Sequence, residues 1–313
     1  MIPPGYAKYE KNVSVACVNF QTKWGDKSAN LKKIERITRE AADLGADVIV
    51  FPELSLSGFE CPERCAMHRD LAEPIPGPST TYLLELTKSL DIYLVIGIPE
   101  RDVKKPDTLY ISCALLGPEG NVGVYRKLSF HARSAGCFKP GDSLPVFETR
   151  YGPVGMQTCS NLWLFPEFSR VLALKGARLI LNPTASPSGP EKPLFLTTQT
   201  VARGTENGIY VASANLVGKE VNMSYYGHSC IGGPAQPSMS HLYAEAGGEE
   251  EIISAVLSFE RLHAYRDSLT FPYGLPLPIV LRELNQIVAK WQEKDSIYTK
   301  EPLKGLVEKL SRA

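Results

Sequence analysis

Short apolar segments alternate with amphipathic segments along this chain, and this alternation limits the folds that it can adopt. Strands are expected at residues 12–20, 47–51 and 92–98, where apolar side chains run together. Between them, apolar residues recur at helical spacing in residues 28–44 and 79–90. Strands that alternate with helices are typical of sheets whose faces are covered by helices.

An antiparallel hairpin interrupts this pattern. Residues 109–116 and 122–125 flank Gly117-Pro118-Glu119-Gly120, which is a turn signal between two apolar runs. Further strands are expected at 154–158, 178–181, 209–214, 229–232 and 251–259, and further helices at 165–175, 193–207 and 278–294. Hairpins mixed with strand–helix units favour a layered α/β fold over a purely parallel one. No composition break marks a linker, so residues 1–313 are expected to form a single domain.

The charge balance excludes several classes of partner. The chain has 34 Lys and Arg residues and 34 Asp and Glu residues, so its formal net charge is zero. Binding to nucleic acid or to an anionic membrane surface needs a basic excess. No segment approaches the roughly 18 apolar residues of a membrane span, and no apolar leader is expected at the start. We therefore expect no nucleic-acid or membrane partner, while a neutral surface is compatible with self-association.

The seven cysteines are odd in number and scattered, several of them within apolar strands. A free cysteine in such a strand behaves as a small apolar residue, so a reduced, cytoplasmic protein is expected. Cys61, Cys65 and His68 resemble half of a zinc site, but no fourth ligand stands at a matching spacing. We therefore expect no bound metal.

One cysteine stands where catalysis is plausible. The apolar run 154–158 ends at Cys159, and a Phe-Pro-Glu helix start follows shortly after. A thiol that is exposed at the carboxyl edge of a sheet, near a helix N-terminus, is expected to favour the thiolate. Glu53 follows the strand 47–51, and Lys127 ends the hairpin. Together they suggest a nucleophile, a base and a cation for an oxyanion.

These three contexts resemble the nitrilase, or carbon–nitrogen hydrolase, superfamily, whose signature is a Glu–Lys–Cys triad. The resemblance covers nearly the whole chain and its motifs follow in family order. Beyond the triad it includes residues 138–142, 173–177, 182–183, 202–210, 215 and 226–229.

The resemblance implies a fold, an assembly and a mechanism. The implied fold is a four-layer α-β-β-α sandwich, paired into a homodimer or higher homo-oligomer, with residues 275–313 as a C-terminal extension in the subunit contacts. Glu53 would take the thiol proton, Cys159 would attack an electron-poor carbon, and Lys127 with a backbone N–H next to the cysteine would stabilise the oxyanion. No metal or cofactor is implied.

Two departures from the family pattern concern the pocket. Many members carry a second glutamate at the position of Ser134, and an acid two residues after the cysteine, where this chain has Asn161. One extra residue also separates Cys159 from the Phe-Pro-Glu motif. Ser134, Ser160 and Trp163 are candidate substrate-binding residues, and the favoured alternative for Trp163 is packing in the core. Both departures make the site less acidic, which suggests a substrate without a cationic head.

The sequence thus predicts a thiol hydrolase that cleaves a non-peptide C–N bond of a small amide or N-carbamoyl compound. Two alternatives stay open at this point. One is a nitrile hydrolase. The other is a catalytically impaired homologue that binds a ligand or partner without turnover.

Overall fold

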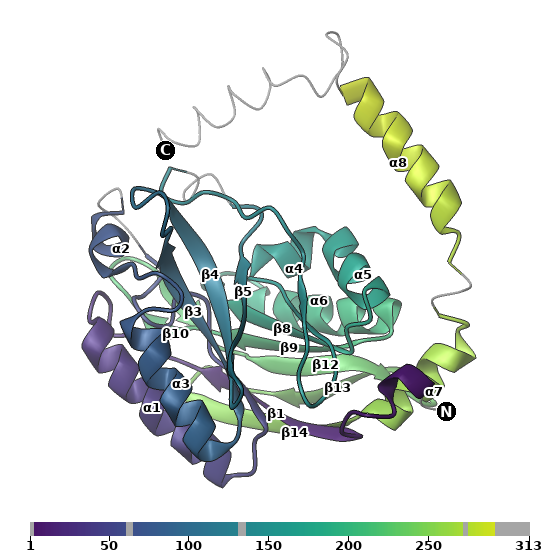
Figure 1. Ribbon diagram of the computed structural model, residues 1–313, viewed down its shortest axis with the longest axis horizontal. Helices are drawn as coiled ribbons and strands as arrows, with labels where there is room; N and C mark the ends of the chain where they lie inside the picture. The colour runs from purple at the N-terminus through teal and green to yellow at the C-terminus, as the bar shows by residue number, and fades with distance from the viewer. Residues whose placement is uncertain (1–2, 61–64, 131–135, 272–274, 292–313) are drawn as a thin grey trace.

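Two six-stranded sheets form the centre of the molecule. The computed structural model describes residues 3–60, 65–130, 136–271 and 275–291 (Figure 1). The first sheet has the order β14-β1-β2-β3-β4-β5 and the second the order β13-β12-β9-β8-β7-β6. The first contains β1 (Asn12–Asn19), β2 (Val48–Val50), β3 (Tyr93–Arg101), β4 (Leu109–Gly117), β5 (Gly120–Arg126) and β14 (Glu251–Ser258). The second contains β6 (Val146–Phe147), β7 (Val154–Met156), β8 (Leu179–Thr184), β9 (Tyr210–Asn215), β12 (Cys230–Ala235) and β13 (Met239–Glu245).

Helices lie on the outer side of each sheet (Figure 1). α1 (Lys27–Asp43) and α3 (Pro78–Leu90) pack on the first sheet. α4 (Ser160–Leu164), α5 (Pro166–Leu174) and α6 (Lys192–Asn207) pack on the second. The remaining elements are η1 (Pro4–Tyr6), α2 (Ala66–Leu71), α7 (Phe259–Ser268), α8 (Leu277–Trp291) and the small sheet of β10 (Val217–Lys219) and β11 (Ser224–Tyr226).

The alternation of side chains along each strand explains why the fold has four layers. In β1, Val13, Val15 and Cys17 belong to the core between the sheets. Ala16 and Val18 instead belong to the core that α1 and α3 cover. Successive side chains of a strand point to opposite faces, and here both faces are apolar, so both must be covered. The expected α-β-β-α sandwich is confirmed.

Strand direction brings the predicted site to one edge of the sandwich. β1, β2 and β3 run parallel in the first sheet, and β7, β8 and β9 run parallel in the second. β5 runs in the direction of β3, because each pairs antiparallel with β4. Ligand sites in α/β folds lie beyond the carboxyl ends of such strands. Those ends are followed by the segments that carry Glu53, Lys127 and Cys159.

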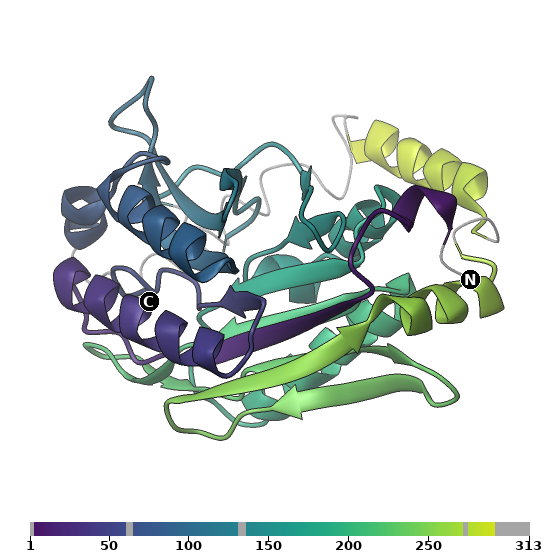
Figure 2. The same cartoon turned by 60° about the horizontal axis from the view of Figure 1, so that its bottom comes forward.

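The expected elements are confirmed within a few residues, but α7, a helix of 10 residues with a buried face, was not predicted. The other unpredicted elements are short or exposed. α4 occupies residues between β7 and α5 that we expected to form a connection, and β13 was not predicted because its side chains are largely exposed. Within the described ranges, no helix has the length and apolar character to cross a membrane. α8 lies apart from both sheets (Figure 1, Figure 2), and its apolar side chains, among them Ile279 and Leu281, are exposed.

Candidate active site

Glu53 and Lys127 form a buried ion pair at the carboxyl edge of the first sheet. Lys127 Nζ donates to Glu53 Oε1 at 2.7 Å, and the two residues are 3% and 0% exposed. Burial alone lowers the pKa of Lys127, but the negative charge of Glu53, the hydrogen bond to it and the interactions with Cys159 and Cys113 outweigh burial and raise the pKa. Lys127 is therefore held as a cation. Glu53 Oε2 has no hydrogen-bond partner among the described residues, so one oxygen is free to accept a proton.

The backbone at Glu53 depends on a glycine that the sequence analysis missed. A Cβ on Gly97, in β3, would lie 2.3 Å from the nitrogen of Leu54 and 2.7 Å from Glu53 Cα. The Glu53 N–H also donates across the sandwich to the carbonyl of Thr184 at 3.3 Å. The first sheet and the second sheet therefore both fix the position of this carboxylate.

Cys159 sits at a sharp strand-to-helix turn of the second sheet. It is the N-cap of α4, with φ of 52° and ψ of −121°, a backbone conformation that a non-glycine residue rarely adopts and that is often found at functional sites. Its N–H donates to Asn182 Oδ1 at 2.9 Å and to the Pro183 carbonyl at 3.0 Å. The N–H of Ser160, by contrast, makes no hydrogen bond to any described residue. It is thus the backbone donor left for an oxyanion.

The expectation of a resting thiolate at Cys159 is wrong. The side chain is only 5% exposed, and burial, with a smaller contribution from the negative charge of Glu53, raises its pKa from 9.0 to about 11. Lys127 and the neighbouring Thr184 lower the pKa, but by less. The sulfur is therefore a protonated thiol near neutral pH.

This pKa gives a prediction for the alkylation of Cys159 by iodoacetamide. The rate, followed by mass spectrometry of the Cys159 peptide, should rise about tenfold per pH unit and level off near pH 11. Glu53→Gln should move the midpoint to lower pH, because it removes a charge that opposes the thiolate. Lys127→Met should move it to higher pH. A wild-type midpoint at or below the ordinary thiol value of about 8.5 would contradict this account.

The candidate substrate-binding residues have different positions. Ser160 begins α4 and is buried. Trp163 is buried in the same apolar cluster as Cys159, with its ring edge-on to Phe195 at 5.5 Å between centroids, and its Nε1 has no partner among the described residues. Ser134 lies outside the described residues. Asn161 is fully buried, and its side chain bonds to the chain around Lys127.

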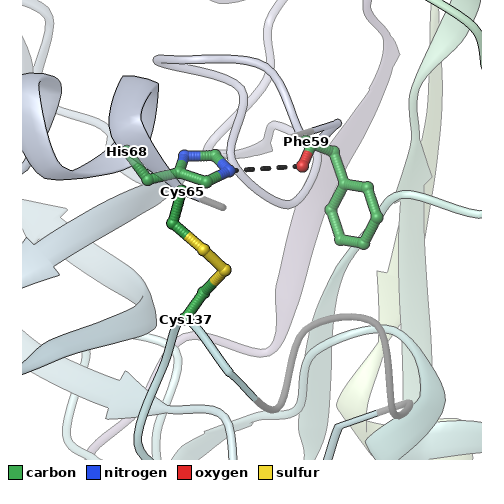
Figure 3. Close-up of a disulfide and its surroundings, with 4 residues drawn as sticks. All are labelled: Phe59, Cys65, His68 and Cys137. Carbon is green, nitrogen blue, oxygen red and sulfur yellow. Dashed lines mark hydrogen bonds between the residues drawn. A yellow bond between two sulfur atoms is a disulfide. The ribbon is translucent and has the colours of Figure 1, made fainter. Parts of the chain in front are cut away.

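A disulfide joins the two loops that follow Glu53 and Lys127. Cys65, just before α2, pairs with Cys137, with 5.7 Å between their Cα atoms (Figure 3). The expectation that all cysteines are free is therefore wrong for this pair, and Cys65 is not available as a zinc ligand. No group of three or more His, Cys, Asp or Glu residues suited to a metal ion occurs in the described ranges, from which Cys61 is missing.

His68 belongs to the packing under this disulfide. Its Nε2 lies 3.3 Å from the Phe59 carbonyl (Figure 3), and its ring contacts Phe138 at 5.2 Å between centroids. Phe138 packs in turn against Leu54, which follows Glu53. Burial lowers the pKa of His68 from 6.5 to about 4. The imidazole is therefore neutral and structural.

This lowered pKa predicts a loss of stability in acid. As pH falls below 6.5 the unfolded state binds a proton at His68, whereas the folded state does so only near pH 4. Stability should fall across that interval, by up to about 3 kcal/mol from this residue. His263, whose pKa burial also lowers to about 4, should add to the loss. Urea denaturation across this pH range should show a shallower loss for His68→Phe, and an unchanged slope would contradict the assignment.

Three polar residues near Cys159 were not singled out from the sequence. Thr184 Oγ1, Ser186 Oγ and Tyr226 OH are buried and make no close hydrogen bond to a described residue. Longer hydrogen bonds link Thr184 to the Cys159 sulfur and Ser186 to Tyr226, and they lower the pKa of Cys159 and of Tyr226. The family motifs at 182–183 and 226–229 pointed to this region, but Thr184 and Ser186 lie outside them, because the positions of isolated hydroxyls depend on tertiary packing.

Comparisons with known proteins identify the family to which this chain belongs. The family model described as carbon-nitrogen hydrolase matches residues 14–267. A nitrilase of Pyrococcus abyssi is 34% identical over 77% of this chain and 87% of its own length. The omega-amidase NIT2 of Xenopus tropicalis is 34% identical over 78% of this chain and 88% of its own length. The crystal structure of Nit3 of Saccharomyces cerevisiae, a member of branch 10 of the nitrilase superfamily, is 25% identical with a TM-score of 0.76, covering 86% of this chain and 97% of that one. The chain therefore belongs to the carbon–nitrogen hydrolase family and is an enzyme that hydrolyses carbon–nitrogen bonds.

Proposed function

We propose that the enzyme hydrolyses a small carboxamide through a thioester on Cys159, with Glu53 as the proton carrier and Lys127 as the oxyanion cation. The observation that supports this most strongly is the buried Glu53–Lys127 pair, 2.7 Å apart, whose second carboxylate oxygen has no partner among the described residues. A buried carboxylate with one free oxygen, near a thiol whose pKa is raised, is suited to take the thiol proton.

Acylation begins with transfer of the Cys159 proton to Glu53 as the sulfur attacks the amide carbon. The C–S bond forms and the carbonyl electrons move to oxygen. That oxyanion is stabilised by the Lys127 ammonium and by the N–H of Ser160. The C–N bond then breaks, and the nitrogen leaves as ammonia after receiving the proton from Glu53.

Deacylation repeats these steps with water. Glu53 takes a proton from the water that attacks the thioester, and the same cation and N–H stabilise the second oxyanion. The C–S bond breaks, and the proton returns to the sulfur as the carboxylic acid leaves. The net reaction is amide plus water to acid plus ammonia, and Cys159 is a thiol again.

The polar groups around Cys159 support a substrate whose other end accepts hydrogen bonds. Trp163 Nε1 is a donor only and has no partner among the described residues, and the hydroxyls of Ser186 and Tyr226, which interact with each other, can also donate. Buried donors without partners are unfavourable until a ligand satisfies them. A carbonyl or carboxylate at the far end would do so, as in the amide of a dicarboxylic acid. The similarity to omega-amidases supports the same class, and a substrate without a cationic head agrees with it.

A substrate panel tests this proposal. Primary amides with a neutral, anionic or cationic far end, N-carbamoyl amines and nitriles would be incubated with the enzyme, and ammonia release measured. We expect the highest kcat/KM for amides with an anionic or uncharged acceptor group. A preference for N-carbamoyl polyamines would overturn the substrate class.

The same panel decides between the two alternatives to amide hydrolysis. A nitrile hydrolase would release ammonia from nitriles and leave the matching amides intact. A binding protein without turnover would release none from any compound, while a compound that raised its melting temperature would still identify a ligand. The free Glu53 oxygen favours turnover, because a pure binding site has no need of an unpaired buried carboxylate oxygen.

We also propose that the enzyme is a homodimer or higher homo-oligomer in which residues 275–313 contribute to the subunit contact. α8 presents exposed apolar residues (Ile279, Val280, Leu281, Leu284 and Ile287), and a large exposed apolar face marks an interaction site. Light scattering after gel filtration should give at least twice the chain's mass of 34.4 kDa. Truncation after residue 274 should weaken the assembly. A cytoplasmic location stays a prediction.

A further inference from the structure

The three residues of the proposed site come from two different sheets. Glu53 and Lys127 follow strands of the first sheet, while Cys159 follows β7 of the second. The Glu53–Lys127 bond lies at the edge of the first sheet and the Glu53 N–H also reaches Thr184 of the second, but the distance from the sulfur to the pair depends on how the sheets are joined at this edge. A displacement of about 1 Å in a reacting group can lower the rate about a hundredfold. The groups that join the two sheets here therefore matter for the reaction.

Asn161, two residues after Cys159, provides the most complete polar connection between them. Its Oδ1 accepts from the N–H of Leu128 at 2.8 Å and from the hydroxyl of Tyr125 at 2.7 Å. Its Nδ2 donates to the carbonyl of Ser129 at 3.0 Å. Leu128 and Ser129 directly follow Lys127 and Tyr125 lies two residues before it, so one buried side chain bonds to the backbone after the lysine and to a side chain before it.

Hydrogen bonds also fix the turn that carries Asn161. Asn161 can therefore set the position of the segment around Lys127 relative to Cys159. The carbonyl of Asn161 accepts from Gln157 Nε2 at 3.2 Å. Arg203, on α6, donates to the carbonyls of Leu162 and Trp163, at 2.9 Å each. α4 is thus anchored to the second sheet and its covering helix.

We propose that Asn161 is a positioning residue, which sets Lys127 against Cys159 by joining the segment around the lysine to the turn around the thiol. The inference rests on the proposed function for its effect on turnover. It gives Asn161 a structural role besides the absence of a negative charge, because every polar atom of its side chain is bonded to protein.

The bonding pattern calls for an amide at this position. An aspartate could accept from Tyr125 and Leu128, but its second oxygen would face the carbonyl of Ser129, and two acceptors repel. A protonated aspartic acid could donate to that carbonyl. Asn161→Asp should therefore be impaired at neutral pH and recover as the pH falls. This is a pH dependence that the wild type lacks.

The experiment compares three variants on the best amide of the panel. Asn161→Ala should lower kcat on the order of a hundredfold and change KM by less than about threefold. Asn161→Asp should lower kcat similarly at neutral pH, with the ratio to wild type improving as the pH falls. Asn19→Ala is the matched control. Asn19 is also fully buried and makes three bonds to main-chain groups, at 2.9, 2.8 and 2.9 Å, but none in the segments beside Glu53, Lys127 or Cys159.

Both alanine variants should lose thermal stability, and only Asn161→Ala should lose kcat. An equal kcat for the two, or a loss at Asn161 that appears only in KM, would overturn the inference.

A second readout does not need turnover. Because Lys127 lowers the pKa of Cys159, a displaced lysine should raise the pH midpoint of Cys159 alkylation in Asn161→Ala. An unchanged midpoint would overturn positioning, whereas a wild type that releases no ammonia from any amide would overturn the proposed function instead.

Discussion

Replacing Cys159 by serine should reduce amide hydrolysis by a factor of about 10⁴ or more in kcat/KM. The hydroxyl is a far weaker nucleophile than the thiol, and Glu53 is placed to accept a proton from a thiol whose pKa is about 11, not from an alcohol. The substitution removes no buried apolar carbon, so the melting temperature should change little. Ammonia release on the best amide of the panel measures the effect.

Cys17 supplies the matched control for this substitution. Like Cys159 it is a buried free cysteine, but it lies in β1, in the core between the sheets. Cys17→Ser should lower the melting temperature, because it places a hydroxyl in an apolar core, and should leave kcat/KM within about threefold of wild type. Equal losses of activity in the two variants would mean that the effect at Cys159 comes from the fold and not from its chemistry.

Removing both members of the buried ion pair should restore the stability that either single substitution loses, but it should not restore activity. Lys127→Met leaves the Glu53 carboxylate buried without its cation, which should cost about 3–5 kcal/mol of folding free energy. Glu53→Gln likewise leaves the Lys127 ammonium buried without its anion. The double variant contains no unpaired charge, so it should regain most of that stability while remaining inactive. Urea denaturation and ammonia release measure the two properties separately.

An exposed pair serves as the control for this double-variant comparison. Lys88 and Glu85 are 2.7 Å apart on the surface of α3. Lys88→Met should change the free energy of unfolding by less than about 1 kcal/mol, because water screens such a pair. If the Glu53→Gln/Lys127→Met double variant is no more stable than either single variant, the pair is not the isolated buried charge pair that the account requires.

Local patterns explain how much of the site could be predicted from the sequence. Glu53, Lys127 and Cys159 each follow an apolar strand, and strand ends that share a direction meet at one edge, so their proximity was accessible to pattern analysis. The two apolar faces of β1 likewise indicated a strand covered on both sides. In both cases the signal lies within a few consecutive residues.

Features that depend on contacts distant in sequence could not be predicted in the same way. The Cys65–Cys137 disulfide joins residues 72 positions apart, and the partners of Asn161 lie more than 30 positions before it. The resting state of Cys159 was predicted wrongly for a related reason. A helix N-terminus favours a thiolate, but α4 is only five residues long, and burial in the assembled sandwich outweighs its effect.

The mass of the Cys159 peptide during turnover tests the central claim most directly. The enzyme would be mixed with a saturating amide, quenched in acid within the first turnovers, digested and analysed by mass spectrometry. The account predicts that this peptide, and no other, gains the mass of the acyl group and loses it again when the amide is exhausted. Ammonia release from an enzyme whose Cys159 peptide stays unmodified throughout would contradict it.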